Sequence, residues 1–127
     1  MVEVETDNTH ATIRILGSHR LLALKRRIEL PLAHISGVRL APEAIGTDGR
    51  KGLKLVGGRV GGRIVGTFRQ DGDTVFWDAT DPQKTIRIDT RDEHFARIFV
   101  DVADPAATVD RLSAAIDAAS GAQASSA

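Results

Sequence analysis

The Asp71-Gly72 dipeptide, which separates two alternating apolar runs, constrains the fold of this chain most strongly. A two-residue Asp-Gly loop favours a type I′ β-hairpin. If Gln70 pairs with Asp73, one face of the hairpin carries three residue pairs: Phe68 with Val75, Gly66 with Trp77, and Ile64 with Ala79. Because Gly66 has no side chain, the indole of Trp77 has room to lie across the sheet. The sequence therefore predicts this hairpin together with its register.

Two more strands are expected after the hairpin. Ile86 and Ile88 alternate with charged residues, and we expect them on the same face as the indole. A turn at residues 81–83 would lead into this strand. A loop at residues 91–95 would then keep Ile98 on the same side as Ile88. The hairpin and these strands are predicted to form an antiparallel meander.

A helix is predicted after the last strand. Asp104 is a good N-cap, and Pro105 suits the first helical position because its missing N–H is not needed there. The helical spacing of the apolar residues that follow predicts one buried stripe, made of Val109, Leu112 and Ile116. Gly121 is the expected helix end. We therefore predict a single domain over residues 1–119 and a disordered tail over residues 120–127.

The first forty residues predict further strands. Alternating apolar residues on both sides of Asp7-Asn8 indicate a first hairpin. Residues 18–25 fit one helical turn or a strand, and their periodicity does not decide between the two. Pro31, between Leu30 and Leu32, indicates an edge strand or the end of a strand. Another strand is expected around Val38.

Length and composition limit the class of protein. The 127 residues, 42% hydrophobic and 27% charged, suit one soluble domain with a single core. The absence of cysteine excludes disulfides, thiolate metal sites and thiol nucleophiles. The apolar runs are too short to span a bilayer, and the acidic, alternating N-terminus is unlike a signal peptide. We therefore expect a cytoplasmic protein with no transmembrane segment.

The charge is zero overall but unevenly distributed. Residues 49–70 contain six bases and no acid, whereas residues 71–110 contain ten acids and four bases. Glycines among the bases would let backbone N–H groups approach an anion. The candidate residues for an anionic surface or partner are Arg50, Lys51, Lys54, Arg59 and Arg63. Zero net charge argues against general binding to nucleic acid, and no specific nucleic acid is expected as a partner.

Residues 41–62 are long for a loop in a compact domain. The glycine-rich run at residues 57–62 is not followed by Lys-Ser or Lys-Thr, so it is no Walker A motif, and its spacing is wrong for a dinucleotide fingerprint. We interpret it as a flexible connection.

No catalytic or metal site is predicted. The histidines, His10, His19, His34 and His94, lack the paired spacing of metal ligands. No serine has a nucleophile-elbow context. The sequence gives no argument for an enzyme, and we expect neither a cofactor nor a metal.

Several stretches share an order with one known family: Leu30-Pro31-Leu32, Ile35-Ser36-Gly37-Val38, Gly66-Thr67-Phe68, Phe76-Trp77-Asp78, Ile86-Arg87-Ile88 and Val102-Ala103-Asp104-Pro105. Over residues 11–119 the chain resembles bacterial pleckstrin-homology-like (PH-like) domains. The resemblance implies a mainly β fold, a barrel or sandwich of about seven antiparallel strands in two near-orthogonal sheets, capped by one C-terminal α-helix. It brings no catalytic residues, and lipid binding does not follow from the fold.

These observations favour a non-catalytic binding or scaffold module that acts through protein–protein contacts or self-association. Exposed strand edges near Pro31 or in the first hairpin would offer pairing surfaces. One alternative is a small-ligand carrier or an enzyme that uses the barrel interior, lined by Trp77, Phe68 and Ile86. Another is weak binding of anionic lipid through the basic, glycine-rich segment.

Overall fold

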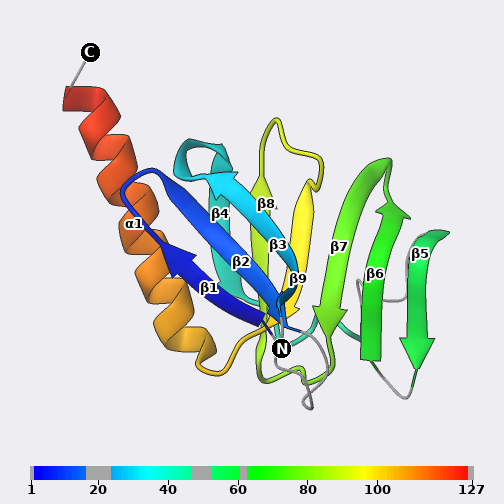
Figure 1. Cartoon of the computed structure of the whole chain (residues 1–127). Helices are drawn as coiled ribbons and strands as arrows, with labels where there is room; N and C mark the ends of the chain where they lie inside the picture. The colour runs from blue at the N-terminus through cyan, green and yellow to red at the C-terminus, as the bar shows by residue number, and fades with distance from the viewer. Residues whose placement is uncertain (1, 17–23, 47–52, 61–62, 126–127) are drawn as a thin grey trace.

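The computed structural model describes residues 2–16, 24–46, 53–60 and 63–125, in which nine strands form two sheets and one long α-helix follows them (Figure 1). The strands are β1 (Val2–Thr6), β2 (His10–Leu16), β3 (Leu24–Pro31), β4 (Ile35–Leu40), β5 (Leu53–Val60), β6 (Arg63–Gln70), β7 (Asp73–Ala79), β8 (Thr85–Thr90) and β9 (Arg97–Asp101). A short 3-10 helix, η1 (Leu32–His34), joins β3 to β4, and the chain continues into α1 (Pro105–Ser125). The predicted class, mainly β with a C-terminal helix, is confirmed. The sheets form an open sandwich with more strands than expected.

The smaller sheet contains β1, β2 and β3 in that order. Val2 pairs with Ile15 and Val4 with Ile13, which confirms the first hairpin. β3 is an edge strand and ends at Pro31, as the proline predicted. Of the ambiguous segment, residues 24–25 belong to β3, and residues 18–23 lie outside the described residues.

The larger sheet has the order β4-β8-β9-β7-β6-β5. Its β6–β7 hairpin has the predicted register, with Gly66 opposite Trp77 and Gln70 opposite Asp73. Asp71 and Gly72 both have positive φ angles, of 54° and 83°, as a type I′ turn requires. The hairpin prediction is therefore correct in every pair.

The predicted antiparallel meander is wrong. β9 lies between β7 and β8 and runs parallel to β7, while β8 pairs with β4 and β9. The connection between β7 and β8 therefore crosses over instead of forming a hairpin, although it contains the expected turn, in which Lys84 N–H donates to Asp81 O. Its start is held by Asp101 of β9, whose carboxylate accepts the N–H groups of Thr80 and Asp81, both at 2.8 Å.

The core has two parts, one on each face of the larger sheet. Between the two sheets, Phe76, Ile86, Ile88 and Ile98 pack against the apolar face of the smaller sheet. On the opposite face, Trp77 belongs to a second cluster that the segment around Ala41 and Ala44 helps to cover. Ile86 and Ile88 therefore do not share a face with Trp77, contrary to the expectation. Ile88 does lie on the side of Ile98, its direct partner.

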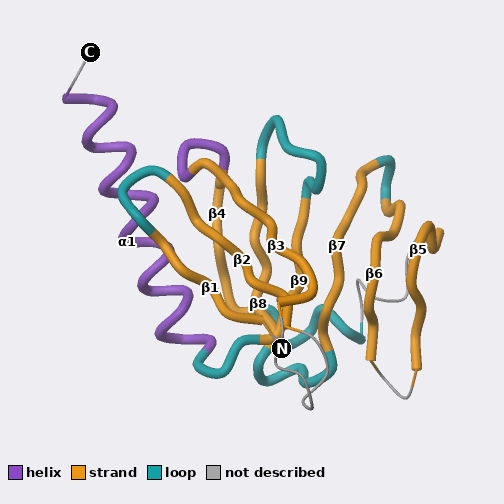
Figure 2. Tube along the Cα trace, in the orientation of Figure 1, coloured by secondary structure: helices purple, strands orange, loops and turns teal. Residues whose placement is uncertain are grey.

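The helix closes one side of the sandwich, next to β1 and β4 (Figure 2). Ala107 N–H donates to the Asp104 carboxylate at 3.2 Å, so the predicted N-cap is correct. Leu112 is fully buried, and Val109 and Ile116 pack beside it. The expected end of the helix at Gly121 is wrong. The helix continues to Ser125 and so includes residues that were expected to belong to a disordered tail. Glycine costs a helix only about 1 kcal/mol relative to alanine, and the good helix formers Ala119 and Ala122 lie close to Gly121 on either side.

Residues 41–62 are not one long loop. They contain a turn at residues 42–46 and the strand β5, which is one of the two outer strands of the larger sheet. Gly57 pairs with Gly66 and Gly58 with Val65, so this part of the expected flexible connection is a β-ladder. Glycine weakens a strand, and here both glycines lie in an outer strand that pairs on one side only. Gly61 and Gly62 lie outside the described residues.

Candidate functional site

The outer edge of β3 is an open strand edge among the described residues. β3 pairs with β2 on one side, and no other strand or helix in the described parts of the chain pairs with its second side. A strand edge of this kind presents N–H and C=O groups that can form a ladder with another extended segment.

The hydrogen-bond pattern identifies which peptide groups of β3 point outward. Leu32 N–H donates to Thr9 O at 2.9 Å, continuing the β2–β3 ladder past Pro31. Bonded and non-bonded positions alternate along antiparallel strands, so Leu30 and Ile28 are also bonded to β2. Arg27 and Glu29 occupy the intervening positions. Their backbone N–H and C=O groups therefore point away from β2, toward the open edge.

The opposite edge of the same sheet is covered. Asp7 N–H donates to His10 O, and by the same alternation the C=O of Val4 points away from β2. Arg111 of α1 donates to that oxygen from Nη2 at 2.7 Å. The helix thus occupies an outward acceptor of β1, whereas β3 has no corresponding cover among the described residues.

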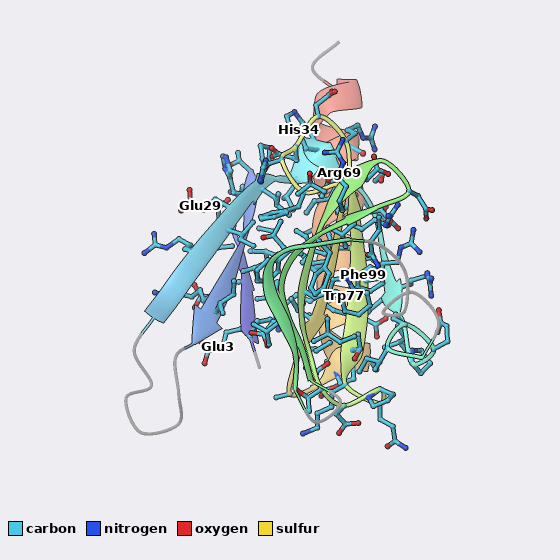
Figure 3. The ribbon with its side chains drawn as sticks, turned by 90° about the vertical axis from the view of Figure 1, so that its right-hand side faces the viewer. Glu3, Glu29, His34, Arg69, Trp77 and Phe99 are labelled. Carbon is cyan, nitrogen blue, oxygen red and sulfur yellow. The ribbon has the colours of Figure 1, made fainter. Side chains whose placement is uncertain are left out.

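The outer face of the smaller sheet is charged. Glu3 and Glu29 point away from the larger sheet (Figure 3). Arg14 of β2 contacts Glu5 at 3.0 Å, and Arg27 contacts Glu29 within β3 at 3.5 Å. These four side chains are between 38% and 59% exposed, so the ion pairs contribute little to stability and remain available to other charges.

The predicted basic site is described only in part. Arg50 and Lys51 lie outside the described residues. Arg59 pairs with Ile64, and Arg63 pairs with Val60, so the backbone of both flanks the β5–β6 connection. Lys54 pairs with Phe68 toward the other end of β5. The hairpin thus brings Arg59 and Arg63 near each other in the fold and separates both from Lys54.

The residues proposed to line a ligand-binding interior do not share one cavity. Phe68 and Trp77 belong to the cluster on one face of the larger sheet, whereas Ile86 belongs to the cluster on the other. Trp77 and Ile86 are fully buried, and Phe68 is 4% exposed. They are core residues, and the arrangement proposed for a carrier or enzyme is not formed by these three side chains.

Asp101 is a buried carboxylate whose three polar contacts all lie within the fold. Besides the two N–H groups of the β7–β8 connection, it lies 2.7 Å from the hydroxyl of Thr85 at the start of β8. Three donors therefore satisfy a carboxylate that is 5% exposed. These contacts hold the crossover that separates β7 from β8.

The three histidines that the structure describes do not converge on one site. His34 Nδ1 lies 3.4 Å from Glu93, His10 Nδ1 lies 2.8 Å from the hydroxyl of Thr9, and His94 meets the ring of Phe95 edge-on. His19 lies outside the described residues. Within the described residues no three histidine or acidic side chains are grouped as metal ligands.

The chain matches no protein-family model, and neither a curated protein nor a solved structure matches it. Within the described residues, no helix has the length and apolar character needed to cross a membrane. The sequence had indicated the β3 edge through Pro31, but not Arg27 and Glu29. Their outward positions follow from the Leu32–Thr9 hydrogen bond, which the sequence does not reveal.

Proposed function

We propose that this protein is a non-catalytic binding or scaffold module that pairs the outer edge of β3 with an extended segment of a protein partner or of another copy of itself. The observation that carries the proposal is the difference between the two edges of the smaller sheet. Arg111 covers an outward carbonyl of β1, and β3 offers the outward peptide groups of Arg27 and Glu29.

Strand addition suits this edge energetically. Backbone hydrogen bonds supply much of the affinity in this mode, and each contributes about 0.5–1.5 kcal/mol net. Side chains on the outer face, here Arg27 and Glu29, would select the partner by charge. The edge ends at Pro31, which cannot donate to a ladder and so limits how far a partner strand can extend the pairing.

The proposal includes membership of the bacterial PH-like family and action in the cytoplasm. A mainly β sandwich with a C-terminal helix against one open side agrees with what that resemblance implies. The parallel β7–β9 pair is a difference from an all-antiparallel arrangement. Binding through a strand edge does not depend on the family assignment, because it rests on the topology alone.

Capture from an extract of the native cell, with Glu29→Pro as the critical variant, tests the proposal. Proline at position 29 removes an outward N–H and leaves the β2–β3 ladder intact, because Glu29 is at a non-bonded position toward β2. Glu29→Ala is the control for the lost carboxylate. We expect a partner, or the protein itself, to be retained by the parent and lost with Glu29→Pro. Retention of every partner by that variant, or a parent that retains none and does not self-associate, would refute the proposal.

A second candidate function is weak docking of the β5–β6 hairpin on an anionic surface. It is favoured by the positions of Arg59 and Arg63, which flank the same connection in the outermost hairpin of the larger sheet. Near an anionic membrane each base contributes about 1 kcal/mol, so the pair together with Lys54 would support only reversible contact.

A further inference from the structure

We infer that the partner that β3 fits is a second copy of this chain, paired antiparallel with the first through β3 so that Ile28 lies on the two-fold axis. The inference rests on the proposed function, since it names a partner for the same strand edge. It joins two smaller sheets into one continuous sheet across the dimer.

The alternation of bonded and non-bonded positions along β3 limits the registers that a β3–β3 pair can adopt. Groups that bond across the new edge must come from residues whose N–H and C=O point outward, which are Arg27 and Glu29. Three registers satisfy this near the middle of the strand. Arg27 lies opposite its own copy, Glu29 lies opposite its own copy, or Arg27 lies opposite Glu29.

The charges select one of the three. Like charges directly opposite each other across an antiparallel pair are destabilising, which disfavours the first two registers. In the third, Arg27 of each copy faces Glu29 of the other, twice by symmetry. Arg27 and Glu29 also contact each other inside each strand. The four side chains would therefore form a square on the outer face in which positive and negative charges alternate.

The surroundings of Arg27 support this register. Arg27 lies directly opposite Arg14 of β2, a like-charged neighbour that is itself engaged by Glu5 at 3.0 Å. The nearest described carboxylate to Arg27, that of Glu29, is 3.5 Å away, and both side chains are about half exposed, at 49% and 58%. Glu29 of a second copy would supply a carboxylate on the side of Arg27 that faces away from Arg14.

The inner face of β3 is compatible with the same pairing. Ile28 is 8% exposed and Leu30 is 3% exposed, so both belong to the core between the sheets. In the selected register Ile28 meets its own copy at a non-bonded position, where side chains on neighbouring strands approach most closely. The apolar core would continue from one copy into the next. Glu29, which points away from the body of the protein (Figure 3), would not obstruct it.

Reciprocal charge reversal tests the register. Arg27→Glu and Glu29→Arg each place two like-charged pairs in the homodimer, and we expect each variant alone to dimerise at least about tenfold more weakly than the parent. A mixture of the two variants places opposite charges in both pairs, so it should form a heterodimer with nearly the parental dissociation constant. Sedimentation equilibrium from about 1 μM to about 1 mM measures these constants.

Glu3→Arg is the matched control, since it makes the same charge change on the same face but on β1, whose edge the helix covers. It should dimerise like the parent, and circular dichroism should show that all variants are folded. Variants that dimerise as the parent does, or a mixture no tighter than either variant alone, would overturn the inference. A parent that stays monomeric also overturns it, while capture of another protein that Glu29→Pro abolishes would leave the proposed function standing.

Discussion

Trp77 stacks on Phe99, its partner across the parallel β7–β9 pair, with ring centroids 4.1 Å apart and planes 12° apart. The indole N–H donates to Gln70 Oε1 at 3.1 Å, so the buried nitrogen is satisfied. On the β8 side, the guanidinium of Arg87 lies 5.7 Å from the centre of the Phe99 ring. These contacts join four strands of the larger sheet, β6 to β9, on the face opposite the smaller sheet.

Trp77→Ala should lower the free energy of unfolding by about 3–5 kcal/mol, because it leaves a cavity in a fully buried cluster. Trp77→Phe is the comparison, since it keeps an aromatic ring against Phe99 but loses the N–H that binds Gln70, and it should cost less. Urea denaturation measures both. A Trp77→Ala variant as stable as the parent would contradict the packing of this cluster.

Gly66→Val should destabilise the fold by about 1–3 kcal/mol through overpacking against Trp77. The backbone adds strain, because Gly66 has a φ angle of 125°, a conformation that residues with a side chain rarely adopt. Gly37→Ala in β4 is the control, because a Cβ there meets nothing within 4 Å. The control should change stability by no more than about 1 kcal/mol. Equal stability of Gly66→Val and the parent would show that the hairpin register is wrong.

Acid should weaken the β1–β2 turn through Asp7. The Asp7 carboxylate accepts the N–H groups of Thr9 and His10 at 2.8 and 2.7 Å, and these bonds lower its pKa below the ordinary 3.8. A lowered folded-state pKa means that this stabilisation is present above 3.8 and is lost as the pH falls through the folded value. The urea midpoint should fall from about pH 5 to about pH 3, and the fall should be larger for the parent than for Asp7→Asn. The same fall in both proteins would contradict the assignment.

The second candidate function predicts co-sedimentation with anionic vesicles and not with neutral ones. The Arg59→Glu, Arg63→Glu double variant should lose this binding, and salt should weaken it in the parent, because exposed charges are screened beyond about 10 Å at 0.1 M. Arg14→Glu, Arg39→Glu is the matched control, with the same charge change on exposed residues of β2 and β4. Equal binding to both vesicle types, or a double variant that binds like the parent, would eliminate the hairpin as an anion-binding surface.

Local sequence signals determined the parts of the fold that were predicted correctly. The β6–β7 register follows from Asp71-Gly72 and the size match between Gly66 and Trp77, all within residues 66–77. The helix start follows from Asp104. The insertion of β9 between β7 and β8 does not follow from local signals, because it depends on long-range contacts such as those of Asp101 with the crossover. Alternation within single strands cannot show that Trp77 lies on the side of Phe99 and not on that of Ile98.

The candidate site was partly predictable for the same reason. Pro31 indicated an edge, because proline cannot donate to a ladder. Which edge stays open depends on where the helix packs, and its packing through residues such as Leu112 brings Arg111 to the carbonyl of Val4, far away in the sequence. The spacing of the basic residues predicts one group, whereas β5 separates Lys54 from Arg59 along its length.

Amide hydrogen exchange of β3, measured residue by residue by NMR at rising protein concentration, tests the role of this edge most directly. The amides of Ile28 and Leu30 should be protected at every concentration, because they are bonded to β2. Those of Arg27 and Glu29 should exchange rapidly in dilute protein and become at least about tenfold slower as the dimer forms. Exchange at Arg27 and Glu29 that does not change with concentration would contradict pairing of this edge with a second copy.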